Sequence, residues 1–255
     1  MPNNGTMPPI EAWQAESLRF TAFPSEIVST EQLSWWETSV ALPPEAVVSR
    51  PKTGQYQAYG DIEGRRLTLQ IQPGRIEWSM KSIVKADDEQ LDVPMLGPFT
   101  EVLGSLSKVV SSWLAQAPAL NRLAFGAVLS QSVENPRQGL LLLQKYLPSV
   151  TIDPDGSSDL FYQINRPRLS LRVDGLRMNR LSKWVLQVAQ RVTLVLGAPN
   201  ETVQRASDFE ASCKLELDMN TAPDFGRALP AEHLGALLQE TIDLGREIAQ
   251  EGDVR

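Results

Sequence analysis

Residues 54–82 constrain the fold more than any other part of this chain, because they alternate apolar and polar side chains between clear turn signals. Leu67, Leu69 and Ile71 alternate with threonine and glutamine, and the same pattern resumes at residue 76 after Pro73-Gly74. A period of two is typical of antiparallel strands with one face on the core and one in solvent. The stretch therefore predicts a three-stranded meander whose apolar face must be covered by helices.

The helices that would cover such a sheet are visible as apolar stripes. Residues 99–114 have apolar side chains at helical spacing, and Gly97-Pro98 precedes them, which favours a helix start. Asn135-Pro136 predicts the start of a second helix, which runs to Pro148, and a third begins near Pro230. Ser29 to Gln32 fits a capping box and predicts a short helix that ends before Pro43-Pro44.

The order of these elements repeats along the chain. A strand at residues 16–23, a helix, the meander and a helix are followed by a strand at 122–130, a helix, further strands at 160–196 and 208–218, and a final helix. We therefore predict an α+β fold with a largely antiparallel sheet and helices packed on one face. It comprises two pseudo-repeated strand-helix-three strands-helix halves, at residues 15–118 and 119–255, after a flexible lead-in at residues 1–14.

Composition narrows the class of protein. The chain has 255 residues, a net charge of −7 and a single cysteine. One cysteine excludes an internal disulfide and suits a reducing compartment, while the acidic balance argues against a protein that coats nucleic acid over its whole surface. No signal peptide and no apolar run of membrane-spanning length are visible, so we expect a cytoplasmic protein without membrane contact.

Several segments together resemble a known group of proteins. They are FTAF, RRLTLQIQPGRIEWSM, the tryptophan-bearing helix, RLAFGAVLSQSV and LELDMNT with the closing helix. In this order they resemble a sporadically distributed bacterial family of uncharacterised proteins of about this length. The resemblance implies an α+β fold and no known enzymatic activity, so no catalytic residue is carried over. The chain departs from the family at NRPRLSLRVDGLRMNRLSKW, which is longer and more basic.

That basic segment is the main candidate site. If Asp174-Gly175 is a two-residue hairpin turn, Arg172 lies opposite Arg177 and the polar face of the hairpin is lined with arginines. Like charges that face each other destabilise a sheet, so such a face would gain from binding an anion. The candidate partner- or anion-binding residues are Arg166, Arg168, Arg172, Arg177, Arg180 and Lys183.

The basic segment has several interpretations. The first is a non-enzymatic binding or assembly protein that contacts an acidic partner protein or another copy of itself; nucleic-acid binding through the same surface is the alternative. The interpretation without a binding function is that the arginines are solvated or paired with carboxylates, including nearby Asp153, Asp155 and Asp159. Residues 181–196 fit a helix as well as a strand, and their valines favour the strand.

Nothing else in the sequence predicts chemistry. Residues 153–159 resemble part of a calcium loop but lack its closing glutamate, so they are interpreted as a polar turn. His233 has no visible partner, and Cys213 alternates with apolar residues as a buried side chain does. We therefore assign no catalytic residue, metal or cofactor. A carboxylate-dependent enzyme without a local motif is the third hypothesis.

Overall fold

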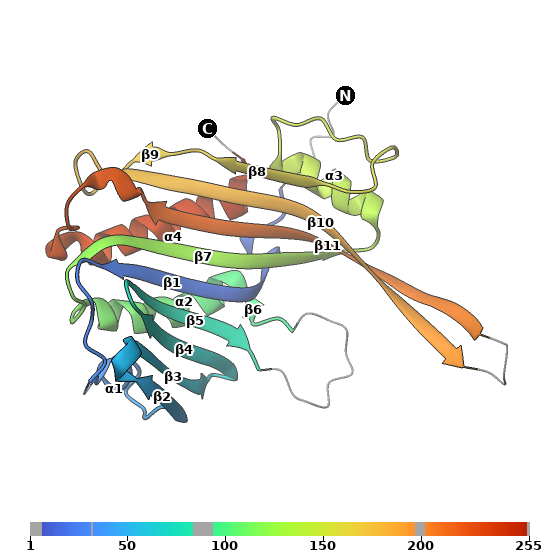
Figure 1. Ribbon diagram of the computed structural model, residues 1–255. Coiled ribbons are helices and arrows are strands. Elements are labelled where there is room, and N and C mark those ends of the chain that lie inside the picture. Colours follow the sequence, from blue (N-terminus) through green and yellow to red (C-terminus); the bar gives the residue numbers. More distant parts are fainter. Residues whose placement is uncertain (1–6, 32, 84–93, 197–201, 254–255) are drawn as a thin grey trace.

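The computed structural model describes residues 7–31, 33–83, 94–196 and 202–253, and only the backbone of residues 190–196 and 202–209 within the last two ranges. Within these residues eleven strands form one antiparallel sheet (Figure 1). The strands are β1 (Gln14–Pro24), β2 (Ala46–Arg50), β3 (Gln55–Ile62), β4 (Arg65–Gln72), β5 (Arg75–Ser82), β6 (Gly97–Pro98), β7 (Leu120–Val133), β8 (Phe161–Asn165), β9 (Arg168–Leu169), β10 (Arg177–Leu196) and β11 (Thr202–Thr221).

Two halves meet at the centre of the sheet. The strand order is β2-β3-β4-β5-β1-β7-β11-β10-β8, with β6 beside β1 and β9 beside β10. The first strand of each half, β1 or β7, therefore lies at the centre, and the last long strand of each half, β5 or β11, lies next to it. The predicted α+β class and the largely antiparallel sheet are confirmed, but more than the three expected strands lie between α1 and α2 and between α3 and α4.

The helices lie on one face of the sheet (Figure 1). They are α1 (Trp35–Val40), α2 (Phe99–Leu114), α3 (Pro136–Tyr146) and α4 (Leu234–Glu251). Alternate residues of the strands point toward them, such as Leu67, Leu69 and Ile71, which are at most 1% exposed. Asn135 caps α3 as predicted, because its side-chain oxygen accepts from the Gln138 N–H at 3.0 Å.

The start of the chain differs from the prediction in two places. Residues 10–12 form a 3-10 turn, and Trp13 is fully buried and donates to the Ala249 carbonyl at 2.8 Å, so this part of the expected lead-in packs on the core. Helix α1 begins at Trp35, after the expected capping box; the Ser29 hydroxyl accepts only a 3.4 Å bond from the Glu31 N–H. Gln32 and the acidic residues 87–89 lie outside the described residues.

Strand β2 was not predicted. Its adjacent residues Val47 and Val48 are both about half exposed, at 48% and 50%, because β2 is an edge strand. Without one buried face it has no alternation of period two to detect. At the other side of the sheet, residues 181–196 are strand, as their valine content favoured.

Candidate functional site

The predicted hairpin at Asp174-Gly175 has a different register in the structure. Strand β9 places Leu169, and not Arg172, opposite Arg177. Residues 170–176 form a loop, in which Gly175 alone has a positive φ, of 73°. The expected pair of facing arginines is therefore wrong.

The side chain of Ser170 explains the loop. Its hydroxyl oxygen accepts from the backbone N–H groups of Arg172, at 3.0 Å, and Val173, at 3.3 Å. A serine that binds the following N–H groups offers the backbone an alternative to the sheet ladder. The Ser170 N–H still donates to the Leu176 carbonyl at 2.8 Å, which closes the loop at its base.

Glu240 of helix α4 fixes the loop from beneath. Its side chain accepts from the Ser170 hydroxyl at 2.6 Å and from the Leu171 N–H at 2.7 Å. Glu240 is only 8% exposed. A buried carboxylate is costly unless it is hydrogen-bonded, and these two donors satisfy both of its oxygens. The loop is thereby held in one conformation.

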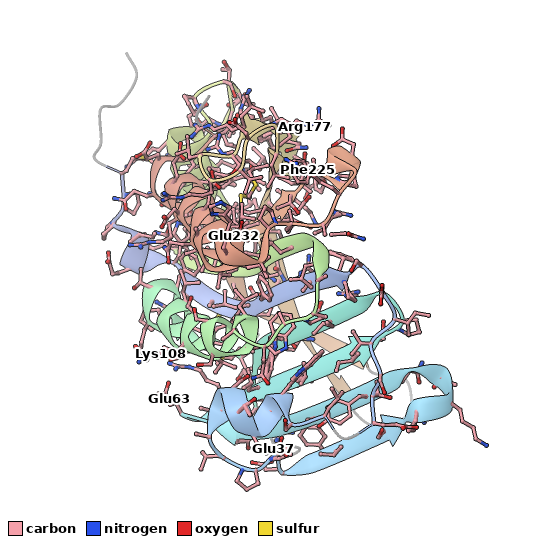
Figure 2. All side chains as sticks on the ribbon, turned by 90° about the vertical axis from the view of Figure 1, so that its left-hand side faces the viewer. Glu37, Glu63, Lys108, Arg177, Phe225 and Glu232 are labelled. Atoms are coloured by element: carbon pink, nitrogen blue, oxygen red, sulfur yellow. The ribbon has the colours of Figure 1, made fainter. Side chains whose placement is uncertain are left out.

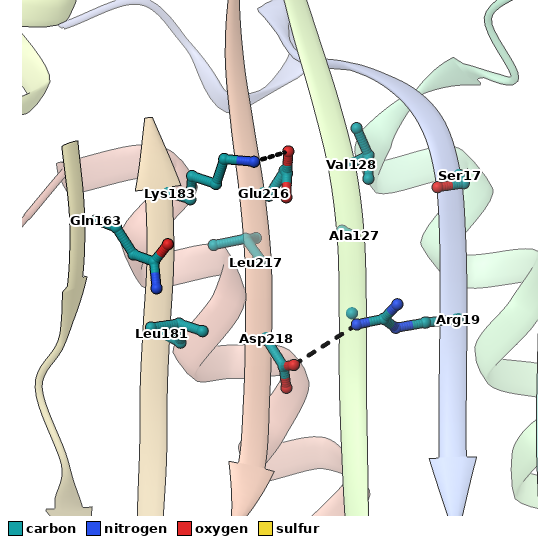
Figure 3. A pocket seen from close by; sticks show the side chains of 11 residues that line it. Ser17, Arg19, Ala127, Val128, Gln163, Leu181, Lys183, Glu216, Leu217 and Asp218 are labelled. Atoms are coloured by element: carbon teal, nitrogen blue, oxygen red, sulfur yellow. Dashed lines mark hydrogen bonds and ion pairs between the residues drawn. The ribbon is translucent and has the colours of Figure 1, made fainter. Parts of the chain in front are cut away.

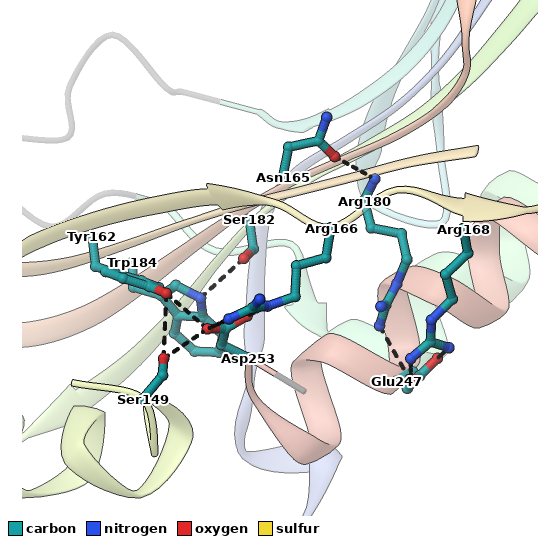
Figure 4. Close-up of polar contacts among 10 residues, drawn as sticks. All are labelled: Ser149, Tyr162, Asn165, Arg166, Arg168, Arg180, Ser182, Trp184, Glu247 and Asp253. Carbon is teal, nitrogen blue, oxygen red and sulfur yellow. Dashed lines mark hydrogen bonds and ion pairs between the residues drawn. The ribbon is translucent and has the colours of Figure 1, made fainter. Parts of the chain in front are cut away.

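Two of the predicted arginines point inward, toward the end of α4 (Figure 4). Arg166 donates to the Asp253 carboxylate, at 2.7 Å from its Nη2. Arg168 makes a bidentate pair with Glu247, at 2.8 and 2.9 Å. Bidentate pairs of this kind are among the stronger hydrogen bonds in proteins. Arg168 therefore attaches β9 to α4, and Arg166 attaches the link between β8 and β9 to the residues that follow α4.

Arg180 points the same way and is almost completely buried, at 1% exposure. Its Nη2 lies 3.2 Å from a Glu247 oxygen, which is within ion-pair distance, but the geometry forms no hydrogen bond at any of its three nitrogens. Burial lowers the pKa of Arg180, Glu247 opposes that shift, and the neighbouring Arg168 adds to it. This arginine is a charge of the interior and is not available to an external partner.

Asp253 is the most enclosed acid of this cluster, with its side chain 2% exposed. Besides Arg166 it accepts from the Tyr162 hydroxyl at 2.8 Å and from the Ser149 hydroxyl at 3.0 Å. The hydrogen bond from Arg166 is the largest cause of its lowered pKa. Gly252 allows the backbone before Asp253 to pass close to Tyr146, because a Cβ at residue 252 would lie 2.1 Å from the Tyr146 carbonyl oxygen.

Lys183 points to the opposite face of the sheet, which carries no helix (Figure 3). Its ammonium group pairs with Glu216 at 2.7 Å. Beside it, Arg19 crosses Gly126 to reach Asp218 at 3.5 Å; a Cβ on Gly126 would lie 2.6 Å from the Arg19 Nε. The resulting depression of about 170 Å³ therefore has equal numbers of positive and negative side chains at these two pairs.

Only part of the basic segment faces solvent near the loop. We define the leucine–arginine patch as Leu169, Leu171, Arg172 and Arg177. The two leucines are 69% and 86% exposed. Arg172 is exposed, and Arg177, with its side chain 52% exposed, pairs with Asp224 at 2.7 Å. Figure 2 shows Arg177 beside Phe225, at the same end of the second half.

The residues that sequence reasoning missed are acids of α4 and the leucines of the loop. Glu240 and Glu247 are seven residues apart, or about two helical turns, so they share one side of the helix. Two acids spaced by seven residues among the apolar side chains of α4 could have predicted carboxylates that face the sheet and require polar partners. The exposure of Leu169 and Leu171 had no local signal, because their alternation with arginines matched a buried strand.

The two other candidates are the aspartate-rich turn at residues 153–159 and Cys213. Among the described residues no cluster of three or more potential metal ligands occurs, and the aspartates at 153–159 form a turn in which Asp153 accepts from the Asp155 N–H at 3.1 Å. Cys213 is buried as predicted, and burial raises the pKa of its thiol to about 12. No helix in the described part of the chain is long and apolar enough to cross a membrane.

Comparison with protein-family models, with curated proteins and with solved structures finds no match to this chain.

Proposed function

We propose that this chain is a cytoplasmic, non-enzymatic binding or assembly protein that contacts an acidic partner protein through the leucine–arginine patch. The observation that carries the proposal is the loop at residues 170–176. Buried Glu240 fixes this loop, and the loop presents Leu171 to solvent at 86% exposure. Arginine is enriched among the residues that dominate binding energy, and an aliphatic side chain on a fixed backbone can act as an anchor when it fills a pocket of the partner.

Preorganisation supports this proposal on energetic grounds. Ordering a loop upon binding costs about 0.5–1.5 kcal/mol for each immobilised side chain, and a loop fixed beforehand avoids part of that cost. The backbone around Leu171 is already held by three hydrogen bonds to Ser170 and Glu240 side chains.

The chemistry of the partner follows from the patch. Arg172 is exposed and Arg177 has a single exposed partner, Asp224, so carboxylates of another protein can approach both. Arg166, Arg168 and Arg180 pair with Asp253 or Glu247, although Arg168 is still 38% exposed. These pairs reduce the net positive charge of the surface predicted to bind an acidic partner protein or, alternatively, nucleic acid. A short acidic segment with one apolar side chain fits what remains.

The test replaces Leu171 with Asp and, separately, Arg172 with Glu. Proteins that co-purify with the wild type from cells that naturally make it are quantified by mass spectrometry. We expect one partner to fall at least about tenfold with either variant, as an interface anchor worth roughly 1.4 kcal/mol or more predicts. Thermal unfolding of both variants should match the wild type, because neither side chain is buried.

Matched controls use equally exposed positions elsewhere. Ile27→Asp changes a leucine-sized side chain that is 79% exposed in the first half, and Lys52→Glu changes an exposed charge there. Both controls should retain the partner. Loss of the partner in the controls as well, or an unchanged partner list in Leu171→Asp, would refute the proposal.

A further inference from the structure

The β10–β11 hairpin extends beyond the rest of the sheet as a two-stranded ribbon (Figure 1). Both strands have 20 residues, and their register continues to Leu196 opposite Thr202. Pairing of β10 with β8 ends at Val185, and pairing of β11 with β7 ends at Ala211. From residue 187 to 196 and from 202 to 210, the described chain supplies no third strand.

Such a ribbon is energetically unfavourable by itself. At about 3.4 Å per residue it projects roughly 30 Å, and an isolated two-stranded hairpin is marginally stable in water. Each ordered residue costs about 1–2 kcal/mol of backbone entropy, which one ladder of hydrogen bonds barely offsets. A third or fourth strand is the usual way to stabilise such a ribbon.

The two free edges of the ribbon differ in sequence. The β11 edge includes Arg205, Asp208 and Glu210, and charges on an edge are a common protection against pairing with other chains. The outer part of β10, residues 192–196, reads Val-Thr-Leu-Val-Leu and contains no charge, proline or glycine. Along residues 192–196 the β10 edge therefore lacks that protection, and Arg191 is the one charge on the uncovered part of β10.

We propose that the β10 edge pairs with the same edge of a second copy of this chain, which forms a continuous four-stranded sheet β11-β10-β10-β11 across a two-fold axis. Identical antiparallel strands related by such an axis satisfy the free backbone groups of both copies. With the axis at Leu194, Val192 faces Leu196 of the other copy and Thr193 faces Val195. No charged residue then faces another, and Arg191 lies beyond the paired segment.

A second copy of this edge meets no repulsion. Self-pairing brings residues near the two-fold axis close to their own symmetry mates, so a charge there would destabilise the pair. Residues 192–196 avoid this in the proposed register because they contain only aliphatic side chains and one threonine. Self-association through the ribbon also leaves the leucine–arginine patch, at the far end of β10, free for another partner (Figure 1).

Molar mass in solution tests the proposal first. We expect light scattering during gel filtration to give twice the monomer mass of 28.3 kDa for the wild type at high concentration. Leu194→Lys should return the mass to 28.3 kDa, and the control Ala206→Lys on the β11 edge should remain dimeric. A wild type that is monomeric at every concentration, a dimeric Leu194→Lys or a monomeric Ala206→Lys would each overturn the proposal.

A variant with a shortened hairpin separates loss of the interface from failure of Leu194→Lys to fold. Ala189 lies opposite Glu210, so Asn-Gly can join them directly in a two-residue turn and replace residues 190–209. This variant retains the pairing of β10 with β8 and of β11 with β7. It should unfold at the wild-type temperature or above and should be monomeric; a dimer would place the interface elsewhere.

Single cysteines test the register. Across the axis, the two Leu194 positions would be about 4.5–5.5 Å apart at Cα, within the roughly 4.4–6.8 Å that a disulfide spans. Thr193 and its symmetry mate would be about 8 Å apart and out of reach. Leu194→Cys should form a disulfide-linked dimer under mild oxidation, whereas Thr193→Cys and Ala206→Cys should not. Native Cys213 is fully buried and does not interfere. Absence of linkage at Leu194→Cys would overturn the register.

Discussion

Arg180 is the residue whose environment departs most from ordinary protein chemistry. It is 1% exposed, its guanidinium nitrogens form no hydrogen bond with the described residues, and the carboxylate that pairs with it, Glu247, also binds Arg168. Asp253 adds a smaller attraction. Desolvation of a buried charge can exceed the attraction to its partner, so an isolated buried pair is weak evidence for stability. The stability of the interior between β10 and α4 therefore depends on Glu247, whose carboxylate pairs with the buried Arg180 guanidinium.

That dependence gives an asymmetric mutational prediction. Glu247→Gln removes the carboxylate that pairs with buried Arg180 and should lower the free energy of unfolding by roughly 3 kcal/mol, the low end for broken buried pairs because Glu247 is 25% exposed. Arg180→Met should be neutral or stabilising, and the double variant should recover most of the loss. Urea denaturation measures all three. Equal destabilisation by Arg180→Met and Glu247→Gln would contradict this account.

Asp253 predicts how stability depends on pH. Hydrogen bonding, first from Arg166, holds the pKa of Asp253 below its unfolded value of about 3.8. A carboxyl whose pKa is depressed on folding stabilises the protein fully above the unfolded pKa, and that contribution is lost as pH falls through the folded pKa. Asp253→Asn should therefore have a lower unfolding temperature than the wild type at pH 7. Below about pH 4 the two unfolding temperatures should converge, because the wild type loses the contribution of the ionised carboxylate.

The measurement for Asp253 is the unfolding temperature of wild type and Asp253→Asn from pH 7 to pH 2.5. Asp155 is a useful control, because Arg137 lowers its pKa as well but the pair is exposed. Exposed pairs contribute little, so Asp155→Asn should leave the curve almost unchanged. A constant difference between wild type and Asp253→Asn across this range would show that the ionised carboxylate is not the stabilising species.

At the scale of elements, periodicity was sufficient wherever an element has one buried face. The meander of β3, β4 and β5 and the helices α2, α3 and α4 follow from alternation, helical stripes and caps. Where both faces are exposed, as in β2, the same reasoning has no pattern to use. The fold class was therefore predictable, and the edges of the sheet were not.

The predicted strand pairing at the candidate site was wrong for a related reason. Asp174-Gly175 does form a turn, since the Leu176 N–H donates to the Val173 carbonyl at 3.2 Å. On the N-terminal side of the turn, backbone N–H groups donate to the side chains of Ser170 and Glu240 and not to a neighbouring strand. Glu240 is 70 residues from Ser170 in sequence. A turn motif predicts local geometry, but long-range polar partners decide whether strands continue up to the turn. Two other distant acids, Glu247 and Asp253, pair with three of the predicted arginines.

One stretch of sequence, residues 166–196, contributes to two separate surfaces of the protein. Residues 166–196 contain the inward arginines, the leucine–arginine patch and the uncharged end of β10. In space, the patch lies at one end of β10 and the ribbon at the other (Figure 1). One long strand thus connects a proposed partner surface with a proposed self-association surface, and the two can be altered independently.

At the scale of the whole molecule, the decisive feature is that the two halves share a sheet. Strands β1 and β7 pair over most of their length, and Phe20 faces Phe125 across the junction. Both rings are 1% exposed, and they belong to one continuous core that includes residues of both halves. A junction made of a strand ladder and buried aromatic rings cannot open without exposing core from each half.

The halves should consequently unfold together. Leu67→Ala in β4 and Leu215→Ala in β11 each remove a fully buried side chain, one in each half, and each should destabilise the protein by about 2–5 kcal/mol. Because the core is continuous, either variant should shift one transition as a whole, with tryptophan fluorescence and far-UV circular dichroism still coincident. Two resolved transitions, of which Leu67→Ala moves only one, would mean that the halves are separate folding units. The shared sheet would then be an interface between two domains and not one core, and the pairing of β1 with β7 would be expected to survive as an association between the separately expressed halves.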